Sequence, residues 1–109
     1  MNMSEEAPAE GTLIIGPLGT IEDADDTVCA LLGYSKDVLL SLHGSDLIPP
    51  EHRPAVAVAL DRMRQDDVAS VAPGLVMRKD GSVLSVEVTA RRLPNKRLAL
   101  SLRPQGAGS

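Results

Sequence analysis

The strictest constraint on the fold is an alternation of apolar and polar residues in two segments close to the C-terminal end of the chain. Residues 84–91 and residues 98–103 each carry an apolar residue at every second position. Because successive side chains of a β-strand point to opposite faces, this period of two indicates two strands that each bury one face. The pattern is typical of an antiparallel sheet, so another layer of structure has to cover the apolar face.

Turn residues predict the strands on either side of these two segments. Asp80-Gly81 joins a run at 71–77 to the first alternating segment, and this dipeptide favours a two-residue hairpin turn with positive φ at both positions. Pro73-Gly74 within the run predicts an edge strand or a bulge, because proline cannot donate a ladder hydrogen bond. Pro94-Asn95-Lys96 predicts the turn before the last strand. Near the N-terminus, residues 12–15 and 20–22 form a hairpin pattern around Pro17-Leu18-Gly19.

The middle of the chain has the spacing of helices. Val28, Leu31 and Leu32 recur at i, i+3 and i+4 after two aspartates, whose charge suits a helix N-terminus, and Gly33 supplies a stop. Ser35 is typical of the N-cap of a second, short helix. A further turn is expected around Asp46-Leu47. The longest helix is predicted from Pro50 to about Asp66, with a stripe of Val56, Ala59, Leu60 and Met63 toward the core and with Asp61, Arg62, Arg64 and Gln65 facing water.

The order of these elements, ββ-αααα-βββ, predicts an α+β fold with one five-stranded antiparallel sheet whose apolar face is covered by the helical insert. The length of 109 residues is that of one domain. We place this domain at residues 11–103, between an N-terminal tail at 1–10 that we expect to be mobile and a C-terminal tail at 104–109 that we expect to be flexible.

Composition narrows the partners that this domain can have. The net charge is −4 and the sequence pI is about 5.0, which disfavours binding to nucleic acid or to an anionic membrane surface. No long apolar run predicts a membrane span, and a single cysteine, Cys29, forms no intrachain disulfide. A cytoplasmic location is therefore expected. Tyr34 is the one aromatic residue, so the core has to be built from aliphatic side chains.

Three segments, in this order, resemble the PAS domain family. Gly19 to Asp25 followed by Leu31-Leu32-Gly33-Tyr34-Ser35 is similar to the G-x-I-x-x-x-N…LLGYS stretch of the family, with Asp25 in the place of the usual asparagine. Asp46 to Arg53 is similar to its D-L-I-H-P-E-D-R segment, and Arg78 to Ser82 with Val86-Glu87-Val88 to its R-K-D-G-S…V-E-V hairpin. The resemblance covers residues 11–103 and implies a sensory and interaction module of a bacterial signal-transduction protein.

The resemblance also implies where a cofactor would be held, and the residues found there disfavour haem and covalently bound flavin. Haem-binding members carry a histidine on the long helix, where this chain has Val56, and its own histidines are His43 and His52. Flavin-binding members that form an adduct carry a cysteine where this chain has Gly44 to Ile48. Cys29 is interpreted as a small hydrophobic residue of the first helix. No cofactor is predicted.

The space between sheet and helices is either a solid core or a pocket for a small apolar ligand, and both alternatives stay open. No charged group is expected to be placed there to hold a carboxylate or phosphate. The predicted walls are all aliphatic or thioether side chains: Val28, Leu32, Leu47, Val56, Leu60, Met77, Leu84, Val86 and Leu100.

The outward face of the sheet is the expected partner surface, because its short and lightly charged side chains allow close approach. We expect a homodimer, or the docking of an effector or partner domain, through Ile14, Ser85, Glu87, Thr89, Arg91, Ala99 and Ser101. Two non-catalytic functions therefore compete, namely a ligand sensor and a pure dimerisation or docking module with a filled core. An enzyme is the least favoured reading, since no catalytic triad, metal-ligand spacing or phosphate-binding loop is present.

Overall fold

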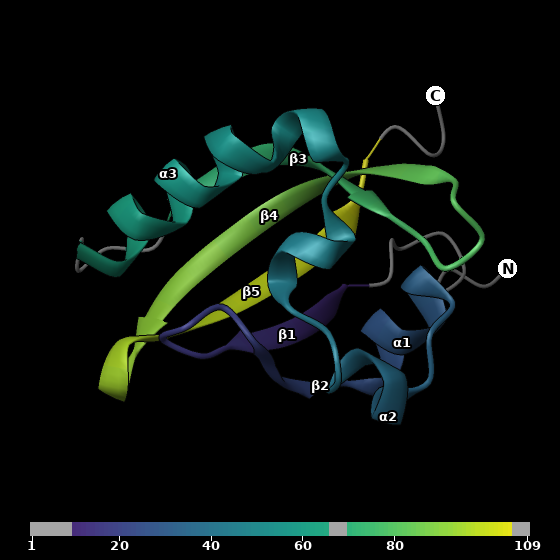
Figure 1. The fold of residues 1–109 in the computed structure, drawn as a ribbon, viewed down its shortest axis with the longest axis horizontal. Coiled ribbons are helices and arrows are strands. Elements are labelled where there is room, and N and C mark those ends of the chain that lie inside the picture. Colours follow the sequence, from purple (N-terminus) through teal and green to yellow (C-terminus); the bar gives the residue numbers. More distant parts are fainter. Residues whose placement is uncertain (1–9, 66–69, 106–109) are drawn as a thin grey trace, which may run out of the picture.

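Five antiparallel strands form the sheet that the alternating pattern predicts. The computed structural model describes residues 10–65 and 70–105. Within them the strands follow the order β2-β1-β5-β4-β3, so the first and last strands of the chain are neighbours in the middle of the sheet (Figure 1). The predicted five-stranded antiparallel sheet is therefore confirmed. The strands are β1 (Gly11–Ile15), β2 (Ile21–Ala24), β3 (Ser70–Met77), β4 (Val83–Leu93) and β5 (Arg97–Pro104).

Strand β3 lies at one edge of the sheet, as its internal Pro73-Gly74 predicts. Its register with β4 runs without interruption from Ser70 opposite Ala90 to Met77 opposite Val83. The edge therefore accommodates the proline without a bulge. The irregularity of the sheet lies instead between β1 and β2, where the register shifts between Ile14 and Ile15.

Two short helices cover the β1–β2 end of the sheet, and both begin where the sequence predicts a helix start. Helix α1 (Asp26–Leu32) starts after Asp25, whose Oδ1 accepts the N–H of Val28 at 2.8 Å and whose Oδ2 accepts the N–H of Thr12 at 3.1 Å. The Asp25 carboxylate thus ties α1 to β1. Helix α2 (Lys36–Leu39) starts after Ser35, whose Oγ accepts the N–H of Val38. A 3-10 helix at Gly44–Leu47 follows, where a turn was expected.

Helix α3 (Arg53–Gln65) follows a 3-10 turn at Pro50–His52 and covers the other part of the sheet (Figure 1). None of its residues is fully buried, and Ala59 of the predicted stripe is exposed. Arg64 does not face water as predicted: its side chain is 17% exposed and its Nη2 donates to the carbonyl of Gly16 at 3.1 Å. Position 64 follows Leu60 by four residues, so it continues the inward stripe of the helix.

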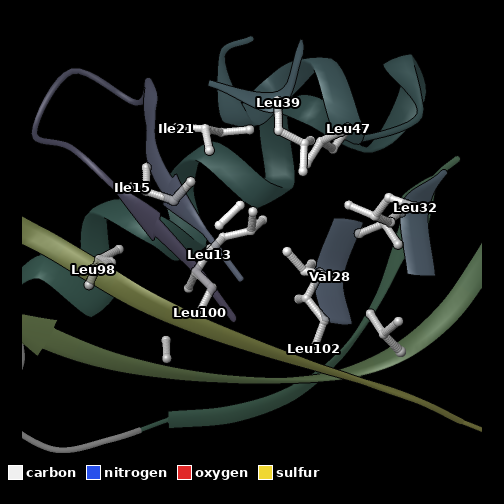
Figure 2. Close-up of a cluster of buried hydrophobic side chains, with 14 residues drawn as sticks. Leu13, Ile15, Ile21, Val28, Leu32, Leu39, Leu47, Leu98, Leu100 and Leu102 are labelled. Atoms are coloured by element: carbon white, nitrogen blue, oxygen red, sulfur yellow. The ribbon is translucent and has the colours of Figure 1, made fainter. Parts of the chain in front are cut away.

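The packed core lies where α1, α2 and the 3-10 helix Gly44–Leu47 meet the sheet, and it consists of aliphatic side chains as predicted. Val28, Leu32 and Leu39 have no exposed surface at all. Figure 2 shows them together with side chains from β1, β2 and β5. The labelled members of this packed core are Leu13, Ile15, Ile21, Val28, Leu32, Leu39, Leu47, Leu98, Leu100 and Leu102.

The turn between β3 and β4 is one residue longer than the predicted two-residue hairpin turn. The N–H of Gly81 donates to the carbonyl of Arg78 at 2.9 Å, and the N–H of Arg78 donates to the carbonyl of Ser82 at 2.8 Å. The loop is therefore Lys79 to Gly81, and Gly81 alone has a positive φ, of 90°. This is a three-residue hairpin loop with glycine in the left-handed position. The loop also contacts α1, because the N–H of Lys79 donates to the carbonyl of Leu32.

The two expected tails fall largely outside the described residues. Strand β5 includes Pro104, which the sequence placed in the C-terminal tail, and the N–H of Gln105 donates to the carbonyl of Ser85 at 2.9 Å. Among the described residues, no helix is both long enough and apolar enough to cross a membrane.

Candidate functional site

A cavity of about 500 Å³ lies between helix α3 and the sheet. Its roof is formed by Val56, Leu60 and Met63 of α3, and Leu47 contributes from the 3-10 helix. The floor comes from every strand except β2. These floor side chains are aliphatic: Leu13, Ile15, Val76, Val88, Leu100 and Leu102. The volume falls within the range of small-molecule pockets in proteins, and the walls are mostly apolar.

The cavity exists because the strand beneath α3 carries small residues on its inner face. Ala72 lies opposite Val88 in the β3–β4 register, and Gly74 lies opposite Val86. A methyl group added at Gly74 would lie 3.2 Å from Val88 Cγ2, so even this small group would require Val88 to shift. Neither Ala72 nor Gly74 reaches up to fill the space under α3. The roof side chains are consequently only half-buried.

One end of the cavity is bordered by the β1–β2 loop, and the His43 side chain forms a hydrogen bond to this loop. The ring Nδ1 of His43 accepts the N–H of Ser45 at 3.1 Å, so the proton of a neutral ring is on Nε2. Nε2 donates to the carbonyl oxygen of Leu18, which lies 2.9 Å away. Gly19 has a φ of 92° and a side chain there would collide with the His43 ring. His43 also lies 2.9 Å from Ser45 Oγ, but this contact belongs to the cap of the 3-10 helix Gly44–Leu47.

Charged side chains border the cavity, contrary to the expectation that none would be placed there. Arg53, Asp61 and Arg64 all line it. The Nε of Arg53 donates to the carbonyl of Ile48 at 3.0 Å. Arg64 makes a 3.5 Å contact from Nη1 to Oδ1 of Asp61 in addition to its bond with Gly16. Asp61 faces water as predicted, with 74% of its side chain exposed, whereas the inward position of Arg64 departs from the prediction that charged residues of the helix face water.

Of the nine predicted pocket residues, the structure places four in the cavity wall, namely Leu47, Val56, Leu60 and Leu100. Val28, Leu32 and Val86 are instead fully buried in the packed core, and Leu84 packs against its edge. Met63 was assigned to the inward stripe of its helix but was left out of the pocket. The floor residues Leu13, Ile15, Val76, Val88 and Leu102 were also missed as pocket residues, although their alternation marks them as inward-facing.

Met77 was placed on the wrong face of the sheet, and the length of the turn explains the error. A two-residue turn at Asp80-Gly81 would pair Met77 with Leu84, on the inner face. The observed three-residue loop pairs Val76 with Leu84 and Met77 with Val83. Because a slip of one residue moves every side chain of a strand to the other face, Met77 lies on the outer face and Val76 lines the cavity.

The residues predicted for the partner surface share the outer face of the sheet. Ile14 lies opposite Ala99 on β5, and Ala99 lies opposite Arg91 on β4. Ala99 is only 6% exposed, so its neighbours cover it already in a single chain. Ser101 pairs with Thr89, and Glu87 forms an ion pair with Arg103. The remaining predicted residue, Ser85, pairs with Leu75 of β3.

The outer face also carries apolar residues of β3 and β4 that sequence reasoning missed. Val71 is 61% exposed and Val83 is 52% exposed. Val71 pairs with Thr89, and Val83 pairs with Met77, so both valines belong to the outer face. The corrected register of β3 would have identified Val71, and the alternation of Leu84, Val86 and Val88 already marks Val83 as outward-facing.

Cys29 does not line the cavity and is held as a protonated thiol. Its side chain, on α1, contacts the packed core and is partly exposed. Partial burial raises the pKa of the Cys29 thiol, and the carboxylates of Asp26 and Asp25 raise it further. A raised pKa makes a cysteine a poor nucleophile at neutral pH. The described residues contain no cluster of three or more His, Cys, Asp or Glu side chains that could hold a metal ion.

Val56 lies at the position on α3 where the family resemblance implies a haem ligand, and its side chain lines the cavity but cannot coordinate iron. His43 is the one histidine among the lining residues, and both of its ring nitrogens are engaged, with Leu18 and with Ser45. His52 lies exposed in the 3-10 turn that precedes α3.

Comparison with known proteins agrees with this geometry. The family model described as PAS domain matches residues 9–101. No curated protein sequence matches the chain.

Several solved structures share the fold. A domain of a sensory box sensor histidine kinase/response regulator from Geobacter sulfurreducens is 24% identical, with a TM-score of 0.77 over 87% of this chain and 82% of that one. The PAS domain of an HTR-like protein from Haloarcula marismortui is 26% identical, with a TM-score of 0.75 over 87% and 80%.

A third similar structure was solved with a small molecule. It is the PAS domain of a LuxR-family transcriptional regulator from Burkholderia thailandensis in complex with ethanol, and it is 16% identical, with a TM-score of 0.75 over 98% of this chain and 100% of that one. The family match spans most of the chain and the five-stranded sheet with its helical insert agrees with it. The chain therefore belongs to the PAS domain family.

Proposed function

We propose that this PAS domain is a ligand sensor that binds a small, mostly apolar molecule in the cavity under α3. The observation that carries the proposal is an aliphatic cavity of about 500 Å³ roofed by a helix with no fully buried residue. A helix held so loosely gains buried surface when a ligand fills the space beneath it. Binding therefore favours an arrangement in which α3 packs more closely against the ligand and the sheet.

A change caused by ligand binding would be transmitted through the sheet to its outer face. On strands β3, β4 and β5 the side chains alternate between the inner and the outer face, so each floor side chain is one position from an outer one. Val88 of the floor, for example, lies between Glu87 and Thr89 of the outer face. A ligand shifts the balance between two packings only by the difference in its affinity for them. The contacts between ligand and floor residues supply that difference.

Two further points support a sensory role. PAS domains are generally sensory modules rather than catalysts, and similar structures belong to a sensor histidine kinase/response regulator and to a transcriptional regulator. The second of these was solved with ethanol bound, a molecule small enough for a cavity of this kind. We infer that this cavity also takes a small organic molecule, without a prosthetic group.

The proposal is tested by titrating the ¹⁵N-labelled protein with primary alcohols from ethanol to octan-1-ol. We expect saturable amide shifts at Val56, Leu60 and Val88, and small shifts at Leu32 and Leu39 of the packed core. Ala72→Leu fills the cavity and should abolish the saturable shifts, whereas Ala30→Leu, on the exposed side of α1, should preserve them. Absence of saturable shifts near the cavity, or their persistence in Ala72→Leu, would contradict the proposal.

We propose in addition that the outer face of the sheet pairs with a second copy of this chain. Two exposed valines, Val71 and Val83, are the observation that favours it, since they lie on a face that also carries the short side chains of Ser85, Thr89 and Ser101. The face also carries Arg91 and Glu87, the latter paired with Arg103 in the same chain, so two copies related by a twofold axis can bring opposite charges together.

The pairing is tested with two valines of nearly equal exposure. Val71 on the outer face is 61% exposed and Val58 on α3 is 59% exposed. Light scattering at tens of micromolar should give a dimer for the wild type and for Val58→Glu, and a monomer for Val71→Glu. A monomeric wild type, or equal effects of the two variants, would contradict the proposal. A mass equal to one copy plus another protein domain would identify a different partner.

A further inference from the structure

We propose that Arg64 binds the head group of the ligand, and that the preferred ligand of the cavity is therefore an aliphatic carboxylate. This inference rests on the proposed function, because it names the class of molecule that the cavity under α3 takes. It departs from a purely apolar site, which the aliphatic walls alone would suggest.

The position of Arg64 is the first reason. Arg64 stands in the last turn of α3 and lines the cavity with a side chain that is 17% exposed. Its guanidinium is held at two points, by the carbonyl of Gly16 on Nη2 at 3.1 Å and by Asp61 on Nη1 at 3.5 Å. These contacts fix the head of the side chain between the β1–β2 loop and the helix, at the border of the cavity.

An unused donor is the second reason. The Nε atom of Arg64 is buried and has no hydrogen-bond partner within residues 10–65 and 70–105. Buried donors in proteins are nearly always paired, because an unpaired one forgoes its bond with water. Because Nε has almost no accessible surface, a ligand oxygen restores that bond only when the Arg64 side chain turns toward the cavity. Guanidinium groups bind carboxylates especially well, because the donor is charged and the planar group presents more than one N–H.

The charge balance at the cavity selects an anion over a cation. The lining side chains that carry charge are Arg53, Arg64 and Asp61, with a neutral ring assigned to His43. Asp61 is 74% exposed, so water screens most of its charge, whereas Arg64 is largely shielded. Arg53 uses its Nε on the carbonyl of Ile48. The net field within the cavity is therefore positive near Arg64, while the walls deeper inside accept an alkyl chain.

The experiment compares three molecules with the same eight-carbon chain, namely octanoate, octan-1-ol and octylamine. Each is titrated calorimetrically, below its micelle concentration, into the wild type and three variants. Arg64→Met keeps the aliphatic stem and removes the donors, and Arg64→Lys keeps the charge and removes Nε. Arg62→Met is the matched control, since Arg62 is the exposed arginine two positions earlier on the same helix.

We expect the wild type and Arg62→Met to bind octanoate at least tenfold more tightly than octan-1-ol, and octylamine most weakly. Arg64→Met should lose the preference for octanoate while its affinity for octan-1-ol stays within about twofold, which also shows that the cavity is intact. Arg64→Lys should retain a reduced preference. Circular dichroism checks the fold of each variant, and Arg64→Lys serves as the test if Arg64→Met does not fold.

Three results would overturn the inference. Equal binding of octanoate and octan-1-ol to the wild type would remove the role of Arg64 and leave the ligand sensor standing. An equal loss in Arg62→Met and Arg64→Met would assign the preference to the general charge of the helix. No binding of any of the three molecules would overturn both the inference and the proposed function.

Discussion

The two parts of the helical layer differ in how tightly they pack against the same sheet. Helices α1 and α2 are short, begin at side-chain caps, and bury Val28, Leu32 and Leu39 completely. Helix α3 is longer than both together, yet none of its residues is fully buried and a cavity lies beneath it. Length and helical periodicity therefore do not measure how well a helix is packed.

We infer from this difference that α1 and α2 stabilise the fold and that α3 responds to the ligand. Aliphatic side chains at native density resist any change of volume, so the packed core beneath α1 and α2 holds the fold together. Regions with few buried contacts open and shift at lower free energy, and ligand-binding elements are drawn from such regions. Helix α3 has the properties of a binding element, while α1 and α2 have those of a scaffold.

The largest effect is expected from truncating equivalent leucines in the two parts. Leu32→Ala removes a side chain with no exposed surface and should reduce the free energy of unfolding by about 2–5 kcal/mol. Leu60→Ala should cost about 1 kcal/mol or less, because Leu60 is half-exposed and already borders the cavity. Urea denaturation followed by circular dichroism measures both. Equal losses would show that α3 is packed as tightly as α1.

Enlarging an alanine should have opposite signs in the two parts. Ala90→Leu inserts volume at a position that is 2% exposed and should destabilise the fold by about 1–3 kcal/mol. Ala72→Leu extends into the cavity from β3 and should stabilise the fold by about 0.5–2 kcal/mol. Both alanines lie on the inner face of the sheet, so the pair isolates the effect of free volume. Destabilisation by both substitutions would mean that the space under α3 is already filled.

The fold was predictable because its signals are local. Alternation at residues 84–91 and 98–103 identifies two strands, and the caps Asp25, Ser35 and Gly33 mark the ends of the short helices. These patterns involve only residues that are close to one another along the chain, so a single sequence is enough to recognise them. The five-stranded antiparallel sheet with helices on one face follows from them, and the family match agrees with it.

The site was only partly predictable, because it depends on register and on empty space. The extra residue in the Lys79–Gly81 loop moved Met77 to the outer face and brought Val76 to the cavity. The inward position of Arg64 was missed because a charged residue was assigned to the solvent side of α3. Packing also could not be inferred from hydrophobicity: Leu32 and Leu60 have the same side chain, and only the small residues on β3 leave the second one beside a cavity.

The Lys79–Gly81 loop links the two parts, since it continues β3 and contacts α1 through Leu32. Gly81 has a φ of 90° and no atom within 4 Å of an added Cβ, so Gly81→Val acts through backbone strain alone. We expect a loss of about 1–2 kcal/mol in the free energy of unfolding. Lys79→Val, in the same loop without positive φ, should have a smaller effect. Equal melting temperatures for Gly81→Val and the wild type would show that the loop adopts another conformation.

The smallest effect concerns the carboxylate that closes this loop. Oδ1 of Asp80 accepts the N–H of Ser82 at 2.8 Å and its hydroxyl at 2.6 Å, and these two bonds lower the pKa of the Asp80 carboxyl. A pKa that is lower in the folded chain than in the unfolded one stabilises the fold above the ordinary carboxyl range. The stabilisation is lost as the pH falls through the lowered value.

Asp80→Asn should therefore lower the melting temperature slightly at pH 7, because an amide oxygen accepts the same bonds without charge assistance. The difference from the wild type should shrink as the pH is lowered, since protonation makes the wild-type side chain neutral as well. Calorimetric scans of both proteins from pH 7 to the acid limit of folding measure this. Because the loop bonds to Leu32 of the packed core, the loss should appear in the unfolding of the whole domain and leave the affinity for octan-1-ol unchanged at pH 7. A difference that grows in acid, or a change in that affinity, would place the Asp80 carboxylate in the responsive part of the molecule with α3.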